Sequence, residues 1–175
     1  MLTRPPLRKP PGETADSTPA QTLSFETRLA QLQSQFGRAF VDSVVCGELL
    51  AYGSGCPGSG GFTPSLSIGA CATPGGPVDL LVNQGLGGAL CLLFVSPPVL
   101  PLTLPWGCVS WVNLSGLFFA LPLQGSAPGL GWAKVVGDVP MGIPNGTAVV
   151  LQAFVHDGGA PHGFSASNAV QLTVY

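Results

Sequence analysis

Residues 148–157 read AVVLQAFVHD, and every second side chain in this stretch is apolar. The apolar set is Val149, Leu151, Ala153 and Val155. The positions between them include the polar Gln152 and His156. A period of two is typical of a β-strand with one face in a core and one face in water. The same alternation recurs at residues 169–175 and 78–83, so the sequence predicts three half-buried strands.

Turn-forming clusters separate these strands from other short apolar segments. They lie at residues 53–61, 74–77, 84–88, 96–98, 124–131, 142–146 and 157–163. Gly and Pro are strong turn signals, and the segments between the clusters would make about eight or nine short strands. The sequence therefore predicts an all-β fold in which two antiparallel sheets form a β-sandwich of immunoglobulin-like or jelly-roll type.

The first 44 residues have a different composition. Residues 1–22 combine five prolines with Thr, Ser and charged side chains, which predicts a disordered Pro-rich tail. Residues 23–44 carry apolar side chains at spacings of four and three, which predicts a short amphipathic helix or linker that packs on the β domain or on an upstream partner. Its apolar face is Phe25, Leu29, Leu32, Phe36 and Phe40. The β-sandwich domain is expected over residues 45–175.

Charge is scarce and unevenly placed. Charged residues make up 8% of the chain, far below the usual quarter, and the net charge is −2. Five of the six basic residues fall in the first 38 positions, so the β domain has no basic field that would attract a nucleic acid. The start of the chain has no apolar stretch typical of an export signal. The most apolar run, residues 89–95, is too short for a transmembrane segment.

The five cysteines favour an oxidising compartment, and the expected location is extracellular or at the cell surface. They are Cys46, Cys56, Cys71, Cys91 and Cys108. No CxxC pair exists, which argues against a zinc knuckle or a thioredoxin-like site. Cys46 lies at the domain junction and is left out of the pairing. The other four allow three disulfide connectivities.

Candidate chemistry is confined to a few side chains. His156, Asp157 and His162 could orient a base or hold a metal ion, but they flank a Gly/Pro loop and fit a solvated turn better. Gly53–Gly58 matches GxGxxG without a following helix, which indicates a tight loop. No catalytic residue, metal site or cofactor is therefore predicted.

Exposed tryptophans are the remaining candidates for ligand contact. Aromatic faces stack on sugar rings, and Trp106 and Trp132 lie in or beside turn clusters. Trp111 lies near Cys108 and is expected to belong to the core. A carbohydrate-binding module that uses Trp106 or Trp132 is thus one alternative function.

Residues 52–61, YGSGCPGSGG, resemble the opening of a Gly/Cys-rich module found at the C-terminal ends of many secreted and surface proteins of planctomycete-type bacteria. Further segments resemble its central hairpin, its later cysteine and its closing strands. They are residues 85–89, 107–108, 151–155 and 163–168. The resemblance covers about residues 50–175. It implies a β-sandwich appended to other domains, with a Cys56–Cys108 bridge and then a Cys71–Cys91 bridge.

The expected function is a non-catalytic extracellular β-sandwich module for adhesion, sorting or surface binding. Its expected partner is an upstream domain, a surface glycan or a surface protein. The alternatives are the carbohydrate-binding module and a hydrolase that uses a His/Asp site.

Overall fold

The computed structural model describes residues 46–70 and 72–175. Within these ranges the regular elements are β-strands and two short 3-10 turns, which confirms the all-β prediction. The strands are β1 (Glu48–Tyr52), β2 (Ser65–Ala70), β3 (Pro77–Leu86), β4 (Leu90–Ser96), β5 (Leu102–Thr103), β6 (Val109–Ser110), β7 (Leu117–Pro122), β8 (Pro128–Asp138), β9 (Ala148–His156) and β10 (Phe164–Thr173). The turns are η3 (Ser59–Gly61) and η4 (Pro161–Gly163). The predicted tail at 1–22 and helix at 23–44 lie outside the described residues.

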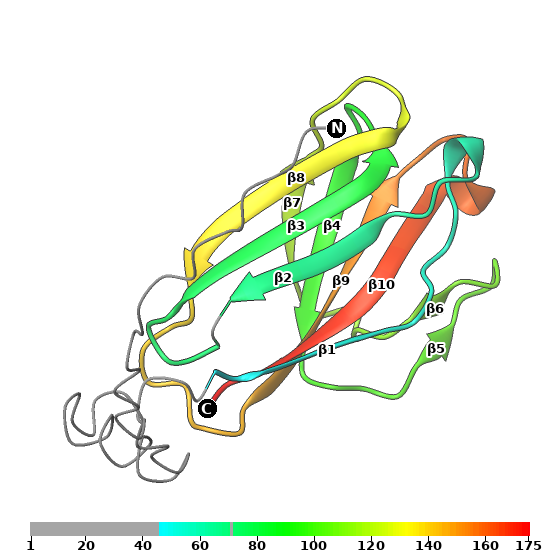
Figure 1. The fold of residues 1–175 in the computed structure, drawn as a ribbon. Helices are drawn as coiled ribbons and strands as arrows, with labels where there is room; N and C mark the ends of the chain where they lie inside the picture. The colour runs from blue at the N-terminus through cyan, green and yellow to red at the C-terminus, as the bar shows by residue number, and fades with distance from the viewer. Residues whose placement is uncertain (1–45, 71) are drawn as a thin grey trace, which may run out of the picture. The chain divides into compact units, whose positions relative to one another are not determined.

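The strands form two main sheets, and every pairing is antiparallel. One sheet has five strands in the order β1-β10-β9-β4-β7, and the other has three in the order β2-β3-β8. The short strands β5 and β6 pair only with each other. Figure 1 shows β2, β3 and β8 as one layer in front of β4, β9 and β10. The loop at Gly53–Gly58 is followed by η3 and β2, so the GxGxxG match is a loop as predicted.

Apolar side chains from both sheets meet in one hydrophobic cluster. The three-stranded sheet contributes Leu66 and Val82, and the five-stranded sheet contributes the inner faces of β4, β9 and β10. From β9 these are Leu151, Ala153 and Val155, which are the side chains that the alternation assigned to the core. The pattern therefore identified the inner face of β9 correctly.

The opposite face of β9 is also buried, which corrects the expectation of a half-exposed strand. Val150 and Phe154 on that face pack with Leu104, Cys108 and Val112 in a second hydrophobic cluster. Gln152, which was assigned to the water-facing side, is 0% exposed. The cause is the segment that carries β5 and β6, because it lies over this face of the five-stranded sheet.

Buried polar groups attach this covering segment to the sheet. The Gln152 side-chain oxygen accepts a hydrogen bond from the Trp111 amide at 2.9 Å. Its amide nitrogen donates to the carbonyl oxygens of Val109 at 3.1 Å and of Ser167 at 2.9 Å. One side chain thus satisfies backbone groups from the covering segment and from β10, which explains why a glutamine is retained in an apolar core.

A second polar side chain connects the two sheets. Asn168 lies at the irregularity in β10 between Ala166 and Ala169, where the pairing with β9 shifts. Its side chain accepts from the Leu66 amide at 2.9 Å and donates to the Leu66 carbonyl at 3.0 Å. It therefore provides β2 with the pair of hydrogen bonds that a neighbouring strand would give.

Candidate binding site

The two sheets come together at the turn between β7 and β8. Gln124 and Trp132 form an isolated bridge there, with N–H···O distances of 2.8 and 3.1 Å. The turn between β3 and β4 packs against the same region, and the Gly87 amide donates to the Ala127 carbonyl at 3.0 Å. A Cβ atom on Gly87 would come within 2.3 Å of the Ser126 amide nitrogen, so this close approach requires glycine. These contacts close one end of the space between the sheets.

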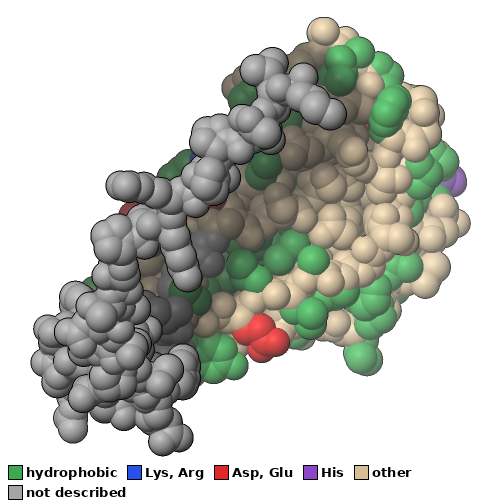
Figure 2. Space-filling model, in the orientation of Figure 1, with side chains coloured by type: hydrophobic (Ala, Val, Ile, Leu, Met, Phe, Trp, Pro, Cys, Tyr) green, Lys and Arg blue, Asp and Glu red, His purple; other side chains and the backbone are tan. Residues whose placement is uncertain are grey.

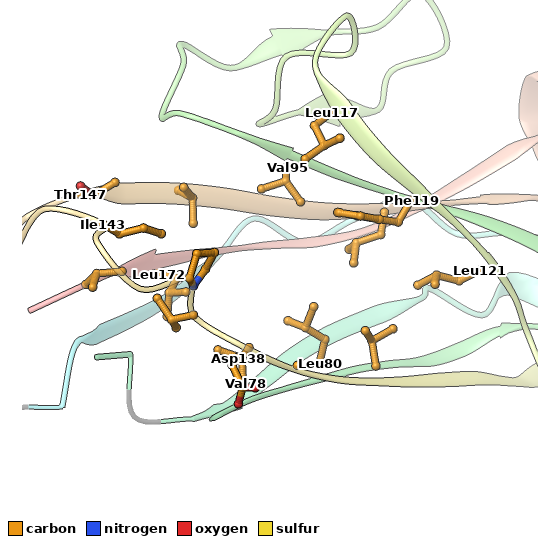
Figure 3. Close-up of a pocket in the computed structure, with 17 residues that line it drawn as sticks. Val78, Leu80, Val95, Leu117, Phe119, Leu121, Asp138, Ile143, Thr147 and Leu172 are labelled. Atoms are coloured by element: carbon orange, nitrogen blue, oxygen red, sulfur yellow. The ribbon is translucent and has the colours of Figure 1, made fainter. Parts of the chain in front are cut away.

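Beyond this bridge β7 and β8 belong to different sheets and are not paired, and a cavity of about 550 Å³ lies in the space between the layers. Residues from both sheets and from the loop after β8 line it. They are Val78, Leu80, Leu93, Val95, Leu117, Phe119, Leu121, Val135, Gly137, Asp138, Val139, Pro140, Ile143, Thr147, Val149, Leu172 and Val174. Figure 3 shows the labelled residues of β7 and β4 on one side of this space and those of β3 on the other. Its size falls within the range of about 300–1,000 Å³ found for small-molecule sites.

The cavity wall is almost entirely hydrocarbon. Thr147 and Asp138 are the lining residues with polar side chains, and the Thr147 hydroxyl already donates to the Pro144 carbonyl at 2.7 Å. Asp138 is exposed at the end of β8 and is the charged residue of the lining. The wall opens to solvent at β7, where Leu117 is 60% exposed and Phe119 is 49% exposed.

Local sequence explains why the space is not filled. Small or branched side chains dominate the lining, and one of its positions has no side chain at all. Gly137 is an exposed lining residue, and a Cβ atom on it would meet nothing within 4 Å, so the absence of a side chain here leaves the rim of the cavity open. Water in an apolar space of this kind finds few polar partners, so its replacement by an apolar ligand is favourable.

The cysteines confirm one predicted bridge and overturn the other. Cys56 and Cys108 form a disulfide with a Cα–Cα distance of 5.7 Å, and it joins the loop after β1 to the covering segment. Cys91 is a buried free thiol, so the predicted Cys71–Cys91 bridge is wrong. Cys91 is on the inner face of β4 in the hydrophobic cluster, and burial raises its pKa to about 12. Cys46 is disulfide-bonded, which the sequence did not predict, and Cys71 lies outside the described residues.

The two candidate tryptophans are in different parts of the fold. Trp132 belongs to β8 and is 41% exposed. Trp106 is in the loop between β5 and β6, and it stacks on His162 with ring centroids 5.5 Å apart. Trp111, which was expected in the core, is only partly buried and packs edge-on against Tyr52 at the margin of the second cluster. Trp106 and Trp132 therefore do not lie on a common sheet face.

The remaining candidate residues, His156, Asp157 and His162, each contact different partners. Asp157 is buried and accepts hydrogen bonds from the amides of Ser59 at 2.7 Å and Gly159 at 3.0 Å, and also from the Ser59 hydroxyl. Burial alone would raise the pKa of this carboxyl, but the hydrogen bonds outweigh burial and hold the pKa below its ordinary value. Asp157 therefore anchors η3 to the end of β9.

The two histidines have aromatic partners instead. His156 packs edge-on against Phe164 with ring centroids 5.5 Å apart, and His162 stacks on Trp106. Within the described residues, no group of three or more His, Cys, Asp or Glu side chains is arranged to hold a metal ion. The site that the sequence did not predict is thus the cavity, and the one local signal for it is the glycine at position 137 in an otherwise apolar inner face.

The described part of the chain contains no helix that is long and apolar enough to cross a membrane. Comparisons of the chain with protein-family models, with curated proteins and with solved structures give no match, so the cavity and its surroundings are the basis for a functional conclusion.

Proposed function

We propose that this chain is a non-catalytic extracellular β-sandwich module that binds an apolar group in the cavity between its two sheets. The observation that carries the proposal is the cavity of about 550 Å³ with hydrocarbon walls and an opening at β7. Burying an apolar ligand there would release water from both surfaces, which favours binding by about 25 cal/mol for each Å² removed from water.

The surrounding framework supports a preformed site. The Asn168 hydrogen bonds to Leu66 and the Gln124–Trp132 bridge connect the two sheets whose inner faces line the cavity. A rigid site loses little conformational entropy on binding, so more of the contact energy remains as affinity.

The extracellular part of the proposal rests on composition and on the disulfide. Structural disulfides persist mainly in oxidising compartments. The face of the molecule in Figure 2 is mainly uncharged, with hydrophobic side chains scattered among other side chains and backbone, as the 8% of charged residues leads one to expect. The sequence resemblance to modules of secreted planctomycete-type proteins points in the same direction.

The alternatives receive less support. The contacts of Asp157 with Ser59 and Gly159 favour a structural role over one in a hydrolase site. Trp132 is exposed enough to contact a glycan. Trp106 stacks on His162 and does not lie next to Trp132, so the two tryptophans do not form one glycan-binding surface.

The test is binding of N-phenyl-1-naphthylamine, an uncharged dye whose fluorescence rises in apolar sites. The full chain should enhance the fluorescence saturably. Gly137→Trp should abolish this because the new side chain would occupy the cavity. Gly69→Trp is the matched control, since a Cβ atom on Gly69 also meets nothing within 4 Å and this residue is outside the cavity lining. No saturable enhancement, or equal loss in both variants, would refute the proposal.

A further inference from the structure

We propose, on the basis of the function above, that the ligand is a single-chain amphiphile with a positively charged head group. Its alkyl chain would lie between the sheets, and its ammonium group would lie at the rim beside Asp138. The inference depends on three features of the described residues, which are the apolar depth of the cavity, the charge at its rim and the absence of a competing cation.

The depth of the cavity selects a chain over a compact polar ligand. Leu80 and Val78 of β3 lie across the space from Val95 of β4 (Figure 3), and these walls offer no hydrogen-bond partner. A sugar, nucleotide or peptide bond placed there would lose its hydrogen bonds to water without replacement. An alkyl chain has no such cost, and each buried methylene improves affinity about fourfold.

The rim selects the head group. Asp138 is exposed at the end of β8 and lines the cavity, so a head group that emerges there meets a carboxylate. Lys134 is the one Lys or Arg residue between positions 46 and 175, and its ammonium nitrogen is 3.0 Å from a carboxylate oxygen of Asp79. The charge of Asp138 therefore has no basic side chain to neutralise it in this part of the chain. An ammonium head group would be attracted, and a fatty-acid carboxylate would be repelled.

The experiment measures displacement of N-phenyl-1-naphthylamine from the full chain at low ionic strength. The competitors are dodecyltrimethylammonium, dodecanol and dodecanoate, which share one chain length and differ in head-group charge. The ammonium compound should bind with an affinity on the order of micromolar. It should bind about fivefold more tightly than the alcohol, and the carboxylate should bind more weakly than the alcohol by a similar factor.

A pair of charge variants isolates the role of the rim. Asp138→Asn should bring the three affinities together, and added salt should do the same in the unaltered chain. Glu48→Gln is the matched control, because it removes one exposed carboxylate at a position outside the cavity lining and leaves the Lys134–Asp79 ion pair in place. It should leave the preference for the ammonium compound in place.

Several results would overturn the inference. One is a carboxylate competitor that binds as tightly as the ammonium competitor, and another is a preference that survives Asp138→Asn. Dye binding that is saturable but indifferent to head-group charge would overturn only the inference and leave the proposed function standing. Absence of dye binding would refute both. Concentration-dependent dimerisation that the dye reverses, seen by sedimentation velocity, would make a second copy of the chain the natural occupant and would also overturn it.

Discussion

Replacing Gln152 with leucine tests how the covering segment is held on the five-stranded sheet. The substitution keeps the side chain at a similar size and removes its two donors and one acceptor. Three backbone groups then lose their hydrogen-bond partner. These groups are the Trp111 amide and the carbonyls of Val109 and Ser167. Leucine is more apolar than glutamine, so the substitution does not reduce hydrophobic burial. Any loss of stability therefore comes mainly from the lost hydrogen bonds.

The cost can be estimated from burial. A buried backbone group without a partner costs about 1–3 kcal/mol. Ser167 is 0% exposed, so its carbonyl would bear the full penalty, whereas Val109 and Trp111 are partly exposed and can recover hydrogen bonds to water. The free energy of unfolding should fall by about 3–5 kcal/mol. The melting temperature should fall by about 10 °C or more for a domain of this size.

Thermal unfolding and hydrogen exchange together check this reasoning. Gln171→Leu is the matched control, because Gln171 lies in β10 and makes no side-chain hydrogen bond within the described residues. It should change the free energy of unfolding by less than about 0.5 kcal/mol. Gln152→Leu should also increase amide exchange at residues 102–112. Equal stability of the two variants would show that the Gln152 hydrogen bonds do not hold the covering segment.

Three further predictions concern other buried groups. Asp157→Asn should lower the free energy of unfolding at neutral pH by about 1–3 kcal/mol. The variant should also lose less stability on acidification, because a carboxyl with a lowered pKa stabilises the fold above about pH 4 and loses that effect as the pH falls through its pKa in the folded state. Equal melting temperatures of both proteins from about pH 7 to pH 2 would contradict this. Alkylation under denaturing, non-reducing conditions should label Cys91, and labelling of Cys91 in the native protein should be slow because burial raises its pKa to about 12. Peptide mapping should find Cys46, Cys56 and Cys108 without label, and label on any of these three would contradict their disulfide bonding. Asn168→Ala should cost about 2–4 kcal/mol because the Leu66 amide and carbonyl both lose their partner, and an unchanged denaturant midpoint would show that β2 is held without it.

The inner faces of the strands could be predicted from sequence because alternation records burial directly. Leu151, Ala153 and Val155 all reach the core that the pattern assigned to them. The outer face of β9 could not be predicted in this way. Its cover comes from a segment with two-residue strands and prolines, which carries no period, so Gln152 was placed in water.

Pairing of the cysteines and the position of the cavity depend on distances between segments, and spacing along the chain does not give those distances. Cys91 is on the inward-facing side of β4, where its free thiol packs in the hydrophobic cluster as a small apolar side chain. The cavity exists because β7 and β8 are bridged only near their connecting turn. No local motif marks that separation apart from Gly137.

The most direct test of the central claim is an intermolecular nuclear Overhauser measurement on the full chain with bound dodecyltrimethylammonium. The alkyl protons should show contacts with Leu80, Leu93 and Phe119, which come from both sheets, and the N-methyl protons should show contacts near Asp138. Contacts confined to exposed side chains outside the cavity, such as Trp132 or Met141, would contradict the account.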